Sequence, residues 1–585
     1  MRYKKIIVGI LGISLIISVS SCKKTFDSML DNPNYPSLAT ADVDLYLNNI
    51  QVSFMTFWSS ASDYGSQLSR QLTWLGPRYR SGYSPASFDD MWTTAYTSVI
   101  KNANAMIPLA QEQKKFVSSG IAKVLEAYTY GTLVDDFGDV PYSEAVLGAD
   151  NTNPNVDPGA TIYAAVQALL DDAITDFQTP GIDPAIDLFY GGNTDNWVRL
   201  AKTLKLKYYM QVRKIDASTA TPAIQALLTE NNLINDASQD FAFKYGTSIT
   251  SPDSRHPHYA LDYNNSGSVG DYIGNYFMWM IAAQKYGGVV TFTGDPRLRY
   301  YFYRTQTNYA WANQATCPCY AGSTFGNSSG IPSWYQNFQI NDGNGVPVRT
   351  PYCVVGRGYF GRDHGDNTGV PPDGSFRTAW GIYPAGGQFD ADQGNDSKNT
   401  VSLSMGGLGA GIAPIWLSSF TSFLKAEAAL TLDIASQGTP KSLLLNGVSA
   451  SITKVLGFPA TVNYTMPAAF ASFVPTQSQI DGYNSLVAKN YDTATTDDSR
   501  LNIIMTEFYL ALWGNGIEPY NNYRLTGKPG NIQPAQNFQD PGFFMRSFFY
   551  PSVFENRNVN APAQKTPGDA VQKVFWDNNP DNFVY

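Results

Sequence analysis

The sequence has little charge, little histidine and little cysteine. Only 15% of its 585 residues are Asp, Glu, Lys or Arg, and it contains three histidines and four cysteines. Structural zinc sites need four Cys or His ligands and a serine triad needs a histidine, so this shortage counts against both. The net charge of −9 comes without a basic cluster. Nucleic acid is therefore not an expected partner, because an acidic protein repels a phosphate backbone.

Aromatic residues, by contrast, make up 14% of the chain. With so few charges, the surface must be built largely from amides, hydroxyls, glycine and aromatic side chains. Such a surface suits neutral, hydroxyl-rich ligands, because aromatic faces stack on apolar sugar faces and amides satisfy hydroxyls. The alternative is that a large, loop-rich extracellular protein simply has this composition.

The N-terminus predicts a lipoprotein. Residues 1–21 combine a basic start, MRYKK, with an apolar run over 6–19, and Ser20 and Ser21 directly precede Cys22. Small residues before a cysteine are typical of a bacterial lipobox, in which Cys22 becomes the lipidated first residue, carrying palmitate. A transmembrane anchor would need about 20 apolar residues, and a plain secretory signal would leave Cys22 without a role. We expect a polar tether over 22–37 and membrane attachment through lipid alone.

The remaining cysteines are Cys317, Cys319 and Cys353. An odd number allows at most one disulfide, which would join Cys353 to one of the other two. A metal site at Cys317-Pro318-Cys319 lacks enough histidine partners, so we expect structural roles. No cofactor is expected.

The rest of the chain, 38–585, is predicted to be one domain in three parts. Helical periodicity dominates 38–235, with apolar stripes over 121–134, 161–177 and 195–214. Residues 236–412 are rich in Gly, Asn, Ser, Pro and Tyr and predict long loops with few short strands, which makes this part the expected ligand-binding region. Residues 413–585 return to helix and end in loops from 516. The fold class is predominantly α, with paired helices that resemble a degenerate helical-hairpin array.

Residues 137–145, FGDVPYSEA, contain two carboxylates and follow a helical pattern. A glycoside hydrolase needs two facing carboxylates, and Asp135, Asp136, Asp139 and Glu144 could supply them. Turn and capping roles account for the same residues, with Gly138 as the left-handed end of the helix. We favour these structural roles and predict that the protein is not an enzyme.

A second polar cluster surrounds His364. Asp363 and Asp366 are weak calcium candidates, because carboxylates suit this cation, but the spacing does not match an EF-hand. The alternative is a polar turn in which Arg362 forms an internal salt bridge.

Aromatic residues in glycine-rich loops are the candidate ligand contacts. We single out Trp74, Tyr79 and Tyr83 in one loop, and Trp311 and Trp334 in the irregular middle. A ring in such a loop has less core to join than a ring on a helix, so these rings are expected to be exposed. Core packing remains the alternative for each of them.

Several short motifs, in order along the chain, resemble the SusD/RagB family of Bacteroidetes outer-membrane lipoproteins, in its SusD-like branch. They are Phe26-Asp27 and Asn32-Pro33-Asn34 after the cysteine, Phe137-Gly138-Asp139-Val140-Pro141-Tyr142, Asn196-Trp197 before Leu204-Lys205-Leu206, Asp295-Pro296-Arg297-Leu298, Lys425-Ala426-Glu427-Ala428-Ala429, and Arg546 with Tyr550-Pro551-Ser552-Val553-Phe554-Glu555-Asn556.

This resemblance implies four tetratricopeptide-like (TPR-like) hairpins in a SusD-like superhelix and a non-catalytic role. A protein of this kind caps a SusC-like TonB-dependent transporter at the surface of the outer membrane and delivers oligosaccharides for uptake. The alternatives are a peptide-binding, RagB-like component of the same kind of complex and, less favoured, a lipid-anchored glycoside hydrolase.

Overall fold

The structure is a computed structural model. It describes residues 42–264, 269–282, 294–307, 340–341, 347–348, 352, 354, 357–366, 377–393, 401–535 and 541–585. The signal peptide, Cys22 and the tether lie outside these residues, and so do Cys317, Cys319 and Cys353. Lipidation and the disulfide therefore stay predictions.

The N-terminal part is helical, as its periodicity predicted. The stripes over 121–134, 161–177 and 195–214 fall in α6, α7 and α8, except that α8 ends at Val212. The sequence offers Asn193, Thr194 or Asp195 as the cap of the third stripe, and Asn193 accepts the backbone N–H of Asn196 at 3.1 Å to begin α8. The helices are α2 (Val43–Leu68), α3 (Tyr79–Gly82), α4 (Asp89–Thr93), α5 (Lys101–Glu112), α6 (Phe116–Phe137), α7 (Gly159–Gln178), α8 (Thr194–Val212) and α9 (Ala217–Glu230), and a π-helical segment, Thr94–Ile100, joins α4 to α5.

Helix α6 is the centre of this part. It packs against α2, α5, α7 and α8, and all of its residues except Phe116 and Lys123 are buried. The side chains on every face of α6 are therefore buried, whereas the sequence pattern indicated a single buried stripe. The helix ends at Gly138, whose φ of +77° is a backbone conformation that favours glycine. The predicted helix end at Gly138 is confirmed, while its ψ of −117° differs from the left-handed helical conformation that was expected.

The middle part begins and ends on a two-stranded antiparallel sheet. Strand β1 (Phe241–Lys244) pairs with β6 (Ile412–Trp416), which brings the two ends of the loop-rich segment together. The three-part division itself stays a prediction. Further elements here are α10 (Pro257–Asp262), α11 (Asn275–Ala282), α12 (Leu298–Tyr301), β2 (Phe302–Tyr303), β3 (Ile340–Asn341), β4 (Pro347–Val348) and β5 (Ala379–Trp380), with β2 paired to β5 and β3 to β4.

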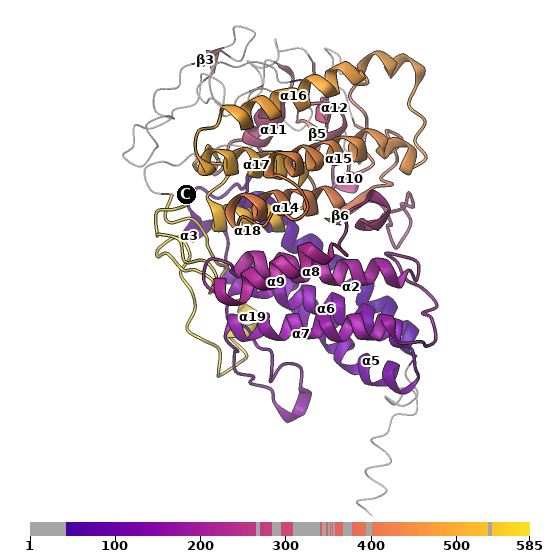
Figure 1. Cartoon of the computed structure of the whole chain (residues 1–585), viewed down its shortest axis with the longest axis vertical. Coiled ribbons are helices and arrows are strands. Elements are labelled where there is room, and N and C mark those ends of the chain that lie inside the picture. The colour runs from indigo at the N-terminus through magenta and orange to yellow at the C-terminus, as the bar shows by residue number, and fades with distance from the viewer. Residues whose placement is uncertain are drawn as a thin grey trace, which may run out of the picture.

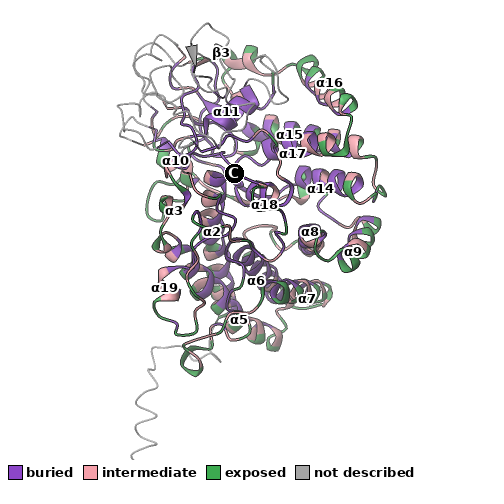
Figure 2. Cartoon of the chain, turned by 90° about the vertical axis from the view of Figure 1, so that its left-hand side faces the viewer, coloured by how far each residue is buried: buried purple, intermediate pink, exposed green. Residues whose placement is uncertain are grey.

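The C-terminal helices continue the stack of the N-terminal ones along the long axis (Figures 1 and 2). Helix α14 packs on α8 and on α15, and α15 packs on α16 and α17. The predominantly α fold with hairpin-like helices and few short strands is confirmed. The helices are α14 (Ser418–Thr431), α15 (Pro440–Thr461), α16 (Gln477–Thr493), α17 (Asp497–Ala511), α18 (Ile517–Thr526) and α19 (Ser552–Glu555).

The prediction of loops from residue 516 onward is wrong for the segment that forms helix α18. This helix contains proline, asparagine and tyrosine, which are weak helix formers, but nine of its ten residues are buried. It contacts α2, more than 400 residues earlier. Tertiary burial therefore overrides local propensity in this segment.

Helix α15 is long and apolar enough to cross a membrane by length and composition alone. Half of its apolar window is nevertheless buried against the rest of the protein. Its neighbours are α14, α16 and α17, so it has the surroundings of a core helix.

A buried carboxylate ties α6 to the C-terminal tail. Asp135 is fully buried and accepts hydrogen bonds from the Tyr163 hydroxyl, from Asn521 Nδ2 at 2.8 Å and from Trp576 Nε1 at 2.9 Å. The ammonium group of Lys207 lies 3.7 Å away. These partners come from α7, α18, the tail and α8, so one side chain joins four segments.

We expect Asp135→Asn to lower the free energy of unfolding by about 1.5–3 kcal/mol, because the three donors lose their charged acceptor. Lys207 keeps its ion pair with the buried Glu518, 3.1 Å away. Denaturant unfolding followed by circular dichroism measures this loss. The matched control is Asp171→Asn, which removes a surface ion pair with Lys205 and should cost about 0–1 kcal/mol because the Asp171 side chain is 60% exposed. Equal losses in the two variants would contradict the central role of Asp135.

Glu126, on α6, predicts a pH dependence of stability. Burial raises its pKa from 4.5 to about 8, while nearby Lys123 acts in the opposite direction. The folded state then holds a proton that the unfolded chain has released, so this residue lowers stability as pH rises from 4.5 to 8. Glu126→Gln, which cannot ionise, should gain stability over the wild type across that interval. Unfolding curves at several pH values measure the difference, and a constant difference would contradict the assignment.

Candidate functional site

Two loops that are far apart in the sequence form one aromatic cluster. Trp74 stacks on Tyr79 with ring centroids 4.6 Å apart and an interplanar angle of 9°. The Tyr79 hydroxyl is 2.8 Å from His364 Nε2, and the Trp74 carbonyl accepts the backbone N–H of Gly365 at 2.8 Å. A Cβ added to Gly82 would lie 2.1 Å from the Trp74 ring, so this glycine allows the chain to wrap closely around it.

The prediction that these aromatic rings are exposed is wrong for Trp74 and Tyr79. Trp74 and Tyr79 are each only 1% exposed, because the loop that contains His364 supplies the core that their own loop lacks. Tyr83 is half-buried, packs edge-on against Tyr64 and donates its hydroxyl to Gln67 Oε1. Trp311 and Trp334 lie outside the described residues. Ligand contact by the five aromatic residues stays a prediction.

The neighbouring polar turn uses its carboxylates internally. Asp366 lies 3.0 Å from Arg362 Nη1, which is the salt bridge expected as the alternative to calcium. Asp363 Oδ1 accepts amide N–H groups from Asn275 at 3.0 Å and from Gln533 at 2.7 Å, and burial raises its pKa to about 6. Donors that point at Asp363 oppose a cation. Within the described residues, no group of three or more Asp, Glu, His or Cys side chains could hold a metal.

The carboxylates of FGDVPYSEA also have structural partners. Asp139 Oδ1 accepts the backbone N–H of Gly159 at 2.8 Å at the start of α7. Glu144 accepts the Asn151 amide at 2.9 Å and the Asn155 backbone N–H at 2.9 Å. The hydrogen bonds from Asn155 lower the pKa of Glu144, which is the opposite of what a general acid needs.

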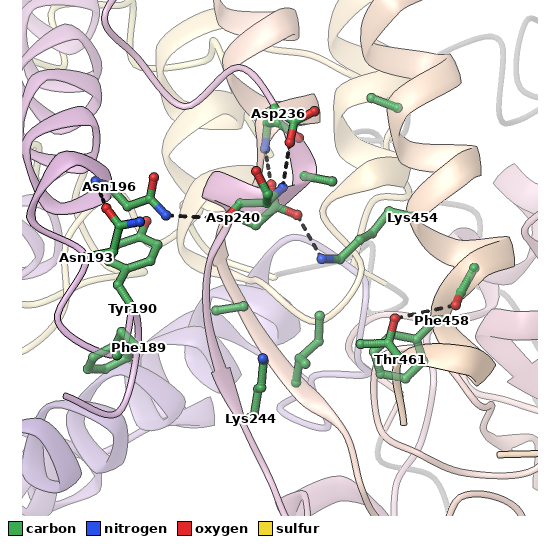
Figure 3. Close-up of a pocket in the computed structure, with 18 of the residues that line it drawn as sticks. Phe189, Tyr190, Asn193, Asn196, Asp236, Asp240, Lys244, Lys454, Phe458 and Thr461 are labelled. Carbon is green, nitrogen blue, oxygen red and sulfur yellow. Dashed lines mark hydrogen bonds and ion pairs between the residues drawn. The ribbon is translucent and has the colours of Figure 1, made fainter. Parts of the chain in front are cut away.

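A cavity of about 1060 Å³ lies away from this cluster, and sequence reasoning missed it (Figure 3). Its walls come from the loop between α7 and α8, from residues 235–244 and from one face of α15. None of Trp74, Tyr79 and Tyr83 lines it. The one local signal was Gly457, a glycine in the interior of an apolar helix. The convergence of the other segments is set by packing between distant parts of the chain.

Comparison with protein families gives two matches that follow one another along the chain. Residues 23–349 match a family described as starch-binding and associated with the outer membrane. Residues 390–561 match the SusD and RagB outer-membrane lipoprotein family. No curated protein sequence matches the chain.

Solved structures share the fold at low sequence identity. A chitin-binding protein is 18% identical, with a TM-score of 0.59 over 92% of this chain and 100% of its own. A chitin-binding SusD homologue from Flavobacterium johnsoniae is 16% identical, with a TM-score of 0.57 over 92% and 99%. A SusD/RagB family protein from Bacteroides thetaiotaomicron is 19% identical, with a TM-score of 0.59 over 92% and 100%.

The first family match alone covers more than half of the chain, and the second covers most of the C-terminal part. The stacked helical hairpins agree with the fold of the solved relatives. The chain therefore belongs to the SusD/RagB family of outer-membrane lipoproteins.

Proposed function

We propose that the protein binds oligosaccharides at the cell surface without cleaving them and delivers them to a SusC-like TonB-dependent transporter in the outer membrane. The observation that carries this proposal is the pair of family matches over residues 23–349 and 390–561. The starch-binding description of one family and the chitin-binding descriptions of two structural neighbours support a carbohydrate ligand. A peptide ligand is the alternative that the test below separates.

The carboxylates that sequence analysis considered for hydrolysis support a binding role. Asp139 and Glu144 are engaged with the backbone and side chains of their own loop region. Asp135 is fully buried where α6 packs against the C-terminal tail. These residues hold the scaffold together, and the ligand contacts are assigned to the aromatic loops.

We expect the mature protein to bind at least one neutral hexasaccharide from a panel of chitin, starch, cellulose and xylan fragments and to leave it intact. Isothermal calorimetry measures binding, and mass spectrometry of the recovered sugar tests for cleavage. The double variant Trp311→Ala, Trp334→Ala should weaken binding at least tenfold, or about 1.4 kcal/mol, because ring stacking is lost.

Three results would contradict this assignment. A panel of hexapeptides is measured in parallel, and binding to these peptides without binding to any of the glycans would favour the RagB-like alternative. Turnover that Asp139→Asn or Glu144→Gln abolishes would favour a lipid-anchored hydrolase. Purification from the native membrane without a TonB-dependent transporter would argue against delivery.

We expect Cys22→Ser to release the protein from the membrane fraction, because the lipid is the proposed anchor. Cell fractionation with palmitate labelling measures both attachment and lipidation. Cys353→Ser, which leaves the lipobox intact, is the control and should remain in the membrane fraction. Retention of the Cys22→Ser protein in the membrane would refute the lipid anchor. Protease digestion of intact cells then tests surface exposure.

A further inference from the structure

The cavity beside α15 has the features of a binding site that the aromatic loops do not account for. We call it the α15 cavity; its walls are the α7–α8 loop, residues 235–244 and the face of α15 that runs from Ala450 to Thr461 (Figure 3). Its volume of about 1060 Å³ slightly exceeds the range of roughly 300–1,000 Å³ for small-molecule sites. It is therefore large enough for an oligomeric ligand.

Fixed aromatic rings form one wall of the α15 cavity. Phe189 packs against Phe241 with centroids 4.7 Å apart, and Tyr190 packs edge-on against Trp197 at 5.2 Å. The Tyr190 hydroxyl donates to the Gln239 carbonyl at 2.9 Å, which further fixes this ring. Both rings are only half-buried and line the cavity. Rings held in place lose little conformational entropy when a ligand stacks on them.

Two of the three carboxylates around the α15 cavity are already paired within the protein. Asp240 lies 2.8 Å from Lys454 Nζ and accepts the backbone N–H of Ser418 at 2.7 Å. Asp187 accepts the Trp197 indole N–H at 2.8 Å, among other donors. Asp236, the third acid, is exposed and accepts the backbone N–H of Ser238 at 2.9 Å. Because two lysines line the cavity together with the three acids, the lining adds little net charge.

Amide, hydroxyl and ammonium groups are the polar groups that remain. Asn193 Nδ2, Thr453 Oγ1 and Lys244 Nζ line the cavity and have no hydrogen-bond partner within the described part of the chain. Amides and hydroxyls both donate and accept hydrogen bonds. Together with the rings, they match a neutral ligand that has hydroxyl groups on its edge and apolar faces.

Helix α15 leaves its backbone accessible at the cavity wall. A Cβ added to Gly457 would meet no heavy atom within 4 Å, although this residue lies inside a 22-residue helix. Glycine at such a position destabilises a helix relative to alanine, but it allows a ligand to approach the backbone closely. Thr453, Gly457 and Thr461 are four residues apart and so lie on one helical face, which carries no bulky side chain at its centre.

From these features we propose that the α15 cavity is a second binding site, which takes several consecutive units of a neutral oligosaccharide. The ligand chemistry is that of the proposed function, but the site is separate from Trp74, Tyr79 and Tyr83. Binding here would hold one part of a chain while the loops hold another, or hold a second chain.

The test fills the cavity without weakening the helix. Gly457→Leu places a side chain in open space and favours helix, so its melting temperature should be equal to or above that of the wild type. The matched control is Gly482→Leu in α16, because a Cβ there also meets nothing within 4 Å and the residue does not line the cavity. The probe is the hexasaccharide panel, measured by calorimetry on the mature chain, with oligogalacturonate as an acidic comparison.

We expect the wild type and Gly482→Leu to bind either two hexasaccharides or one hexasaccharide that contacts two separable regions. Gly457→Leu should then lose one of the two sites, or its affinity for the hexasaccharide should fall at least tenfold. Oligogalacturonate should not compete for this site. The Trp311→Ala, Trp334→Ala variant should retain binding at the α15 cavity. Adding Gly457→Leu to this double variant should abolish that remaining binding.

Two outcomes would overturn the second site while leaving the proposed function intact. One is that the Gly457→Leu variant binds with the same affinity and the same stoichiometry as the wild type. The other is complete loss of binding in the Trp311→Ala, Trp334→Ala variant. Absence of binding by the wild type to every neutral hexasaccharide would overturn both proposals. Preference of the site for oligogalacturonate would refute its neutral ligand class.

Discussion

The architecture depends on one buried anion, the carboxylate of Asp135 at the end of α6. A carboxylate removed from water is costly unless charge and hydrogen bonds compensate it. Here Tyr163, Asn521 and Trp576 donate to it, and Lys207 lies beside it. Because these partners belong to α7, α18, the tail and α8, the compensation exists only when the first and last parts of the chain are packed together. The helix end at FGDVPY therefore serves the scaffold.

Buried ion pairs repeat this arrangement elsewhere in a protein that has few charges. Arg213 pairs with Glu427, and Arg297 pairs with Asp295 and lies 3.3 Å from Glu507. The first pair joins the residue that follows α8 to α14, where the two halves of the helical stack meet, and the contact between Arg297 and Glu507 joins the middle part to α17. Replacing a whole buried pair with apolar groups can be neutral, but removing one partner leaves an uncompensated charge. Such pairs specify which segments must meet, and apolar burial supplies most of the stability.

The scaffold divides its aromatic residues between two tasks. Trp74 and Tyr79 are enclosed with His364 and hold two distant loops together, so they position the surface that the loops build. Phe189 and Tyr190 are anchored on their inner sides and keep part of their surface toward the α15 cavity. A binding protein benefits from this division, because rigid inner rings let the outer ones meet a ligand without reorganisation. The same physical reasoning links the fold to recognition without requiring a catalytic group.

Local sequence patterns determined the elements that depend on near neighbours. The apolar periods predicted α6, α7 and α8, Asn193 was one of three candidate caps, and Gly138 was identified as a helix end, because each depends on residues only a few positions away. Tertiary structure decided what depends on distant contacts. The core around Trp74 comes from a loop almost 300 residues later, α18 is helical because its surroundings bury it, and the α15 cavity forms only where distant segments converge. Burial is set by what packs against a residue, and periodicity within one segment contains no information about that partner.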